Sequence, residues 1–178
     1  MRFTGVLMKK MNLVLFVCIG GLLTALAVLF QSAPILLPVV GLVLSPFSTL
    51  PIALAAMANV YLGCSVFFSC ALILTFISVQ EAMILLFTTG LLGLVMGALL
   101  YRKGILISNL LSSLALSLGM MFLTYVVGIS GFVEMTSSLS TLLTYAIFYL
   151  FSLVYASLWN LCLRKFLNYL SKIKVLTK

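Results

Sequence analysis

The chain has 178 residues, of which 65% are hydrophobic and only 7% are charged. No water-soluble domain needs so apolar a composition, so the sequence predicts an integral membrane protein. The net charge of +8 does not indicate a nucleic-acid partner, because all ten basic residues lie in three clusters that flank apolar stretches.

The inventory of reactive side chains is small. Histidine and aspartate are absent, and the only acids are Glu81 and Glu134. General acid–base chemistry and metal sites need more carboxylates or imidazoles than this, so we expect neither an enzyme nor a cofactor or metal site. The four cysteines show no paired spacing and are interpreted as small buried hydrophobic residues: Cys18, Cys64, Cys70 and Cys162.

Apolar runs of roughly 17 to 25 residues predict six transmembrane helices. They cover about 11–30, 35–62, 65–77, 82–101, 105–129 and 139–163. The third run is short for a span unless it begins before Gly63. The prediction is therefore an all-α membrane bundle over 11–163, with a basic N-terminus (1–10) and a basic tail (164–178) that lies along the anionic leaflet.

The basic clusters give this bundle an orientation. With six spans, the N-terminus, the loop that contains Arg102 and Lys103, and the C-terminal tail all lie on one side, which the positive-inside rule makes the cytoplasm. Glu81 and Glu134 then face outward. A five-span count would separate the basic clusters and is disfavoured. We expect a multi-pass protein of the bacterial cytoplasmic membrane with both termini cytoplasmic.

The second span is interrupted by prolines. The stretch 33–63 contains Pro34, Pro38, Pro46 and Pro51, which exclude one straight helix. Broken backbone inside a membrane is tolerated where it is buried in protein or lines a cavity, and it often marks a transport or binding site. A kinked helix that only packs against its neighbours is the alternative, and either a re-entrant pair or a kinked through-helix fits the sequence.

Small residues spaced four apart mark two possible helix contacts. Gly21 and Ala25 lie on the first span, and Gly93 and Gly97 on the fourth. Such spacing lets helix backbones approach closely, either within the chain or with a partner helix. At about 100° per residue, the glycines fall opposite Thr88 on the fourth helix, so the face with Thr88 is the candidate for a ligand cavity.

Polar and aromatic residues gather in the outer halves of the later spans and in the outer loops, where they suit a small, flat, polar ligand. The candidate ligand-binding residues are Gln80, Glu81, Thr88, Tyr125, Glu134, Tyr145 and Tyr149.

Simpler roles remain open for several of these candidates. Ser78 and Glu81 fit a helix capping box. Tyr145 fits an interfacial belt of aromatic residues. Glu134 fits a solvated loop acid. Asn109 and Asn160, near the other ends of the fifth and sixth spans, are better explained by hydrogen bonds between helices.

The whole pattern resembles the substrate-binding membrane subunits (S components) of energy-coupling factor transporters. The resemblance covers nearly the whole chain and includes the first helix GGLLTALAVLF, the second segment LLPVVGLVLSPFSTLPIALAA and the fourth helix FTTGLLGLVMG. It implies that a vitamin-like micronutrient binds near the outer face, and that a transmembrane coupling protein with two ATPases docks on the cytoplasmic side. In this family an A-x-x-x-A motif on the first helix makes that contact. Gly21 and Ala25 hold the matching spacing, with glycine in place of one alanine.

Two other functions stay open. A non-catalytic membrane scaffold that resembles the rod-shape-determining membrane proteins has similar size and span count, and its small-residue faces would recruit partner helices. A small permease working alone is the third interpretation, although the chain shows no buried charge for ion coupling. The chain has no Walker-type G-x-x-x-x-G-K-[ST] motif, so it would need a separate ATPase.

Overall fold

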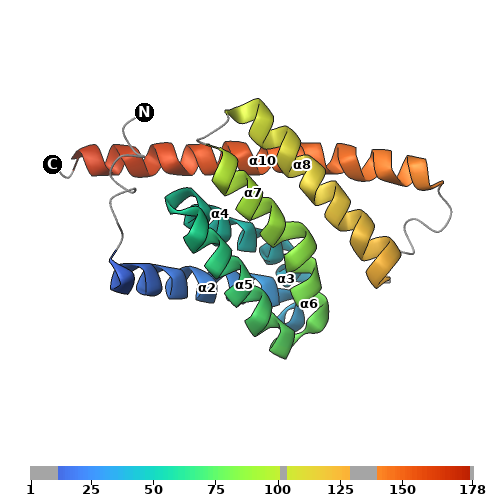
Figure 1. The fold of residues 1–178 in the computed structure, drawn as a ribbon, viewed down its shortest axis with the longest axis horizontal. Coiled ribbons are helices and arrows are strands. Elements are labelled where there is room, and N and C mark those ends of the chain that lie inside the picture. The colour runs from blue at the N-terminus through green and yellow to red at the C-terminus, as the bar shows by residue number, and fades with distance from the viewer. Residues whose placement is uncertain (1–11, 101–103, 129–139, 177–178) are drawn as a thin grey trace.

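A computed structural model of the chain describes residues 12–100, 104–128 and 140–176. About 94% of these residues are helical and none lies in a strand (Figure 1). The helices in chain order are α2 (Leu13–Leu36), α3 (Pro38–Leu44), the 3-10 helix η1 (Ser45–Ser48), α4 (Thr49–Ala58), α5 (Val60–Ile77), α6 (Val79–Ile84), the π-helix η2 (Leu85–Thr89), α7 (Gly90–Leu99), α8 (Ile105–Phe122), the π-helix η3 (Leu123–Val127) and α10 (Thr141–Leu176).

Six helical segments of the described chain are long and apolar enough to cross a membrane, which confirms the predicted all-α, six-span class. They are Leu13–Leu36, Pro38–Ala58, Val60–Ile77, Val79–Leu99, Ile105–Val127 and Thr141–Phe166. The start of α2 and the end of α10 lie toward the same end of the molecule (Figure 1).

One predicted boundary was wrong, and one that the sequence left open lies at the earlier position, each for a physical reason. The first span continues to Leu36, past its expected end near residue 30, because Gln31 and Ser32 are buried in the bundle and do not mark a polar end. The third span begins at Val60, before Gly63, because the side chain of Asn59 caps the helix by accepting from the Tyr61 N–H at 2.9 Å.

The prolines of the second span sit where helical segments end or begin. Pro34 lies in the last turn of α2, Pro38 is the first residue of α3, Pro46 the second of η1, and Pro51 lies in the first turn of α4. A proline in a first turn costs no helical hydrogen bond, since that N–H has no partner there. From Pro38 to Ala58 the backbone is therefore helical throughout, with a 3-10 segment at η1.

The hydrophobic core has two parts that meet at α4. Ile52 and Ala55 of α4 belong to a cluster with buried residues of α2, α5 and the α6–η2 region. Ala53 belongs to a second cluster with α7, α8 and α10, in which Met96 and Trp159 are buried. The helices α2 and α10 lie on opposite sides of α4 (Figure 1), so the broken second span forms the centre of the bundle.

Gly93 and Gly97 pack within the chain, which is one of the two contacts that their spacing allowed. Both glycines face α4: a Cβ added at Gly93 would lie 2.7 Å from the carbonyl oxygen of Thr49, and one at Gly97 would overlap the carbonyl oxygen of Ala53. These glycines let α7 and α4 approach closely within the chain, so their face is already occupied.

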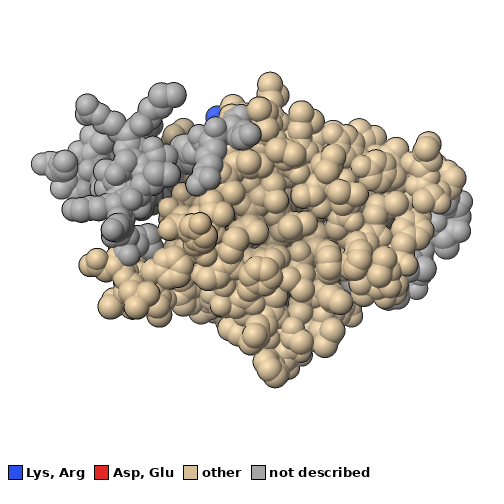
Figure 2. Space-filling model, in the orientation of Figure 1, with Lys and Arg blue, Asp and Glu red and all other residues tan. Residues whose placement is uncertain are grey.

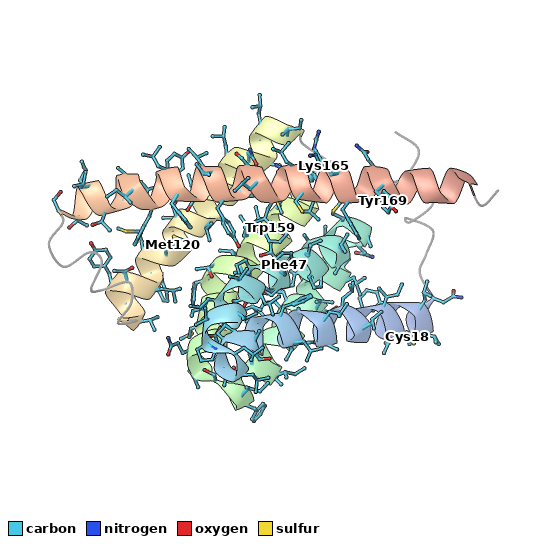
Figure 3. The ribbon with its side chains drawn as sticks, turned by 180° about the vertical axis from the view of Figure 1, so that it is seen from behind. Cys18, Phe47, Met120, Trp159, Lys165 and Tyr169 are labelled. Atoms are coloured by element: carbon cyan, nitrogen blue, oxygen red, sulfur yellow. The ribbon has the colours of Figure 1, made fainter. Side chains whose placement is uncertain are left out.

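The last helix is longer than a membrane span. Helix α10 continues from Thr141 to Leu176 without a break at Arg164, where a separate basic tail was expected. Trp159 of α10 contacts the second span, with its ring 5.6 Å from that of Phe47 in an edge-on arrangement (Figure 3). Lys165 and Tyr169 are exposed further along the same helix.

The described surface is apolar. Many large hydrophobic side chains are exposed, among them Val39 at 81% and Leu106 at 79%. On the face in Figure 2 the described surface is almost free of charged side chains. A surface of this kind needs lipid rather than water around it.

Candidate functional site

A buried glutamine joins three parts of the bundle. Gln31 on α2 has no exposed surface. Its Oε1 accepts hydrogen bonds from Ser48 Oγ at 2.7 Å and from Thr89 Oγ1 at 3.0 Å, and its Nε2 donates to Glu81 Oε2 at 2.8 Å. We call Gln31, Ser48, Glu81 and Thr89 the Gln31 network.

The chemistry of the partners fixes how the Gln31 amide is turned. Two hydroxyl groups point at one end of the amide and a carboxylate at the other. The carboxylate of Glu81 only accepts when it is ionised, so the NH₂ group must face it, and the hydroxyls of Ser48 and Thr89 then donate to the oxygen. A buried amide that makes three such bonds is held in one orientation.

The two irregular helices supply the hydroxyls. Ser48 is the last residue of η1, inside the broken second span, and is fully buried. Thr88 and Thr89 are consecutive residues at the end of the π-helix η2, and both are buried. The Thr88 hydroxyl donates to the carbonyl of Ile84, one turn earlier. π-Helical turns are rare and occur often at functional sites.

A small cavity lies beside this network. It has a volume of about 140 Å³ between η2, α8 and α10. The lining residues are Thr88, Thr89, Leu116, Met120, Phe151 and Tyr155. Thr89 belongs both to the cavity lining and to the Gln31 network, so it connects the cavity to Glu81.

Only one half of the predicted capping box at Ser78 and Glu81 is formed. The Ser78 hydroxyl accepts from the backbone N–H of Glu81 at 3.4 Å, as in a capping box. The carboxylate does not return to the Ser78 N–H, which bonds the carbonyl of Leu74 instead. The Glu81 carboxylate is half-buried and accepts a hydrogen bond from Gln31, so it does not cap the helix.

The other predicted ligand-binding residues are dispersed. Thr88 lines the cavity, whereas Gln80 is exposed on α6 and Tyr125 is 52% exposed on η3. Tyr145 and Tyr149 stack on each other along α10, with ring centroids 6.4 Å apart, and neither lines the cavity. Glu134 lies outside the described residues.

Gly21 and Ala25 lie on an open surface. Both are exposed, and a Cβ added at Gly21 would meet nothing within 4 Å. They line a groove of about 450 Å³ between α2 and α5, whose other walls include Ser65 and Ser69. The described residues contain no group of three or more His, Cys, Asp or Glu side chains that could hold a metal ion.

Sequence reasoning missed Gln31, Ser48, Thr89 and Tyr155. One signal for Gln31 was present: an uncharged polar side chain inside an apolar stretch usually points into the bundle. Comparisons of the chain with protein-family models, with curated proteins and with solved structures found no match.

Proposed function

We propose that this protein is the membrane-embedded solute-binding subunit of a micronutrient uptake system, energised by a separate ATPase module. The observation that carries the proposal is the cavity beside Thr89, because one wall of it is hydrogen-bonded to the fully buried Gln31 in the interior of the bundle. Polar groups are costly to bury in a membrane protein, and those that persist often serve a ligand or its path.

The cavity lining favours a small, mainly apolar solute with one hydrogen-bonding group. The wall is almost wholly apolar: Leu116, Met120 and Phe151 offer apolar contacts, and the hydroxyl of Thr89 is the polar group beside them. The hydroxyl of Tyr155 faces Trp159 and Thr49 instead. A volume of about 140 Å³ resembles that of cavities which hold a single aromatic ring. The solute class is therefore a small ring compound.

The Gln31 network would preorganise this site. Thr89 Oγ1 is held by Gln31, and Gln31 is held in turn by Ser48 and Glu81. A hydroxyl already fixed in place loses little entropy when a solute binds to it. Its lone pairs stay available to accept from the solute, because its proton is donated to Gln31.

The proposal includes an orientation and partners. The positive-inside rule places the basic ends of the chain in the cytoplasm of a bacterium, where a transmembrane coupling protein and two ATPase subunits would dock. Gly21 and Ala25 are the proposed contact for the coupling protein, since they are exposed on α2 and leave room for a close helix approach.

The test is retention of a solute by the purified protein. Chain purified from native membranes in mild detergent is denatured, and the released small molecules are identified by mass spectrometry. We expect one enriched compound. Its retention should fall about tenfold in Thr89→Val, because that variant loses one well-placed hydrogen bond to the solute.

A matched variant distinguishes the loss of a contact with the solute from a general loss of folding. Thr75 on α5 is exposed, and its hydroxyl donates to the carbonyl of Ala71. Thr75→Val therefore removes a threonine hydroxyl away from the cavity, and this variant should retain the solute. Equal retention in Thr89→Val and Thr75→Val would refute the cavity assignment. No enriched compound in the wild-type protein would refute the function.

The α2–α5 groove favours a second candidate, a membrane scaffold. A groove lined by Gly20, Gly21, Thr24 and Ala25 on one helix and serines on the other suits a partner transmembrane helix. Affinity capture with identification of the bound proteins distinguishes the two functions. A coupling protein with two ATPases supports the transporter, and cell-wall or cytoskeletal proteins without a bound solute support the scaffold.

A further inference from the structure

The buried faces of α8 and α10 carry polar atoms that have no hydrogen-bond partner. In the part of the chain that the structure describes, six buried side-chain nitrogen and oxygen atoms lack a hydrogen bond, and five of them lie on these two helices. They are Ser108 Oγ, Ser112 Oγ, Ser152 Oγ, Asn160 Oδ1 and Arg164 Nε. The three serines have no exposed surface. An unpaired polar atom inside a membrane protein is costly, so these atoms call for a partner that the two helices do not supply.

Other serines on α8 show that a hydroxyl of this helix can be satisfied without such a partner. Ser113 and Ser117 also have no exposed surface, but each donates to a carbonyl oxygen three residues earlier, at 3.0 Å. A hydroxyl bonded to its own helix needs nothing further. Ser108 and Ser112 do not make this bond, so their hydroxyls are available to a group that lies between the helices.

The unpartnered residues form two rows. Ser108 and Ser112 are four residues apart on α8, which puts them on one face of that helix. Ser152, Asn160 and Arg164 are separated by multiples of four on α10 and also share one face. The two helices run in opposite directions (Figure 1), so both rows lead toward the same end of the bundle.

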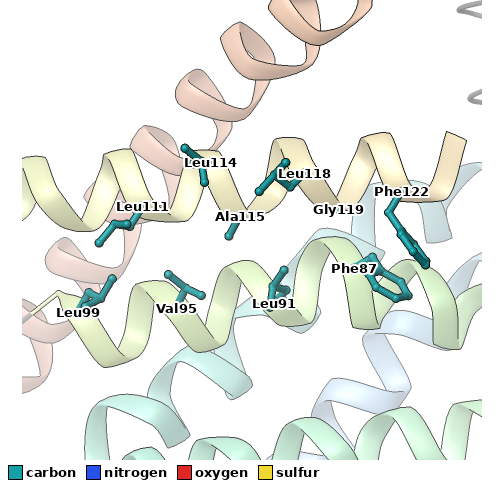
Figure 4. Close-up of a pocket in the computed structure, with 10 residues that line it drawn as sticks. All are labelled: Phe87, Leu91, Val95, Leu99, Leu111, Leu114, Ala115, Leu118, Gly119 and Phe122. Carbon is teal, nitrogen blue, oxygen red and sulfur yellow. The ribbon is translucent and has the colours of Figure 1, made fainter. Parts of the chain in front are cut away.

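The polar contact of α8 is with α10 and not with α7. The groove between α7 and α8, of about 520 Å³, has no polar side chain in its lining, and Leu111, Ala115 and Leu118 are among its residues on α8 (Figure 4). On the other side, Asn160 Nδ2 of α10 donates to Asn109 Oδ1 of α8 at 2.7 Å. The two rows therefore pass through the junction of α8 and α10.

The rows connect the surface to the cavity beside Thr89. Arg164 is half-buried and lies two residues before the end of the candidate span Thr141–Phe166. At the other end, Ser152 follows Phe151, which lines the cavity. The 12 positions between these two ends of the α10 row correspond to roughly 18 Å of helix.

Water is the partner with the right size and chemistry. A buried water bonds two to four polar groups, and it both donates and accepts. Side chains one helical turn apart, such as Ser108 and Ser112, have Cβ atoms about 5–6 Å apart, a gap that one water bridges. Asn160 Oδ1 is an acceptor and Arg164 Nε, one turn later, is a donor. Water satisfies both atoms, whereas an anion or a cation would satisfy only one.

We propose that the junction of α8 and α10 holds a file of buried water, which connects the Arg164 end of the bundle to the cavity beside Thr89. Ala156, the residue of the α10 row between Ser152 and Asn160, has only a methyl group, so no large side chain of this row closes the file. Buried polar side chains of this kind mark the paths of solutes and ions in membrane proteins. This inference does not rest on the proposed solute-binding function, because the file holds water whether or not a solute occupies the cavity.

The reaction of single cysteines with silver ions tests the proposal. A silver ion is small enough to pass along a file of water and does not enter a dry apolar interior. It bonds the sulfur of a thiol as the thiol proton leaves. The full chain, with its four natural cysteines replaced by alanine, is placed in nanodiscs, and the silver adduct of each variant is followed by mass spectrometry. We expect Ser112→Cys and Ser152→Cys to react.

Ser113→Cys and Ser117→Cys are the matched controls, because both serines are as buried as the test positions but bond their own helix. Ser113 is next to Ser112 in the chain. Ser117 lies at a depth comparable to that of Ser152, since each is eight residues from the asparagine pair that joins the two helices. The controls should react at least about tenfold more slowly. Equal rates in the four variants would overturn the proposal, whether all were fast or all were slow.

A second measurement uses the wild-type chain and needs no variant to fold. Hydroxyl radicals made from water by X-rays oxidise the side chains that lie beside that water, and mass spectrometry identifies the products. Met120 lines the cavity at the end of the file, whereas Met96 has no exposed surface and lies outside the cavity lining. Met120 should therefore be oxidised faster than Met96. Oxidation of Met120 no faster than that of Met96 would overturn the proposal.

Discussion

The side-chain amide of Gln31 on α2 donates to the carboxylate of Glu81 on α6 over 2.8 Å, although 50 positions separate the two residues in the chain. The same amide accepts from hydroxyls on η1 and η2, so one side chain joins the first, second and fourth spans. Gln31 has no exposed surface. If its amide is removed, neither water nor a lipid headgroup can therefore take its place as the hydrogen-bond partner of these groups.

The first prediction concerns the stability of this network. Gln31→Leu keeps a side chain of similar size but leaves the buried hydroxyls of Ser48 and Thr89 without an acceptor. We expect a loss of about 1–3 kcal/mol in the free energy of unfolding, the usual cost of buried polar groups left unpaired. Thermal unfolding in detergent should show a Tm lower by at least about 2 °C.

Gln80→Leu is the control for this measurement, because Gln80 is exposed and the same change there should stay within about 0.5 kcal/mol of wild type. If Gln31→Leu were as stable as Gln80→Leu, the network would not hold the bundle together.

The sequence predicted the number of spans and one helix cap better than it predicted the burial of single residues. Cys70 is buried as expected, but Cys18 and Cys162 are exposed. Hydropathy identified six spans because each helix is apolar over its own length. Ser78 was confirmed as a helix cap, because local spacing is enough to indicate it. Asn109 and Asn160 were confirmed to bond between helices, although the sequence did not predict that they bond each other. The Gln31 network depends on pairs 17, 50 and 58 positions apart, which no local pattern records.

The π-helix η2 explains why the fourth helix was only partly predicted. A wheel at 100° per residue assumes a regular α-helix from Glu81 to Gly97, but the i→i+5 turn at Leu85–Thr89 inserts a residue and rotates the rest of the helix about its axis. Thr88 and Thr89 are both buried as a result. Thr88 was predicted from the wheel and lines the cavity, while Thr89, the residue with the hydrogen bond to Gln31, was not.

The second prediction concerns the contact between α4 and α7. In Gly97→Leu the new side chain meets the backbone of Ala53, which cannot move without displacing the centre of the bundle. We expect a destabilisation of about 1–3 kcal/mol or more, the usual range for overpacking. Gly21→Leu makes the same change where nothing lies within 4 Å, and its Tm should match that of wild type. Equal Tm values for the two variants would contradict this packing.

The third prediction concerns the junction of α8 and α10. Asn160 Nδ2 donates to Asn109 Oδ1 at 2.7 Å, and Asn109 Nδ2 donates to Ser157 Oγ at 2.9 Å. A double-mutant cycle of Asn109→Ala and Asn160→Ala should give a coupling energy of about 0.6 kcal/mol and no more than about 1.7, the range for such bonds in membranes. A cycle that pairs Asn109→Ala with Gln80→Ala should give no coupling. Strict additivity in the first cycle would show that the two amides act independently.

The fourth prediction concerns the continuity of α10 beyond the membrane. In a chain whose cysteines are replaced, spin labels at Leu150→Cys and Lys174→Cys report the distance between two points of this helix. An unbroken helix places the two backbones roughly 36 Å apart, because each residue adds about 1.5 Å along the axis. A tail that turned at Arg164 to lie along the membrane surface would shorten the separation to roughly 26 Å by the same rise per residue. Pulsed electron spin resonance in nanodiscs separates these values. We expect the longer distance, since α10 continues through Arg164 to Leu176 without a break.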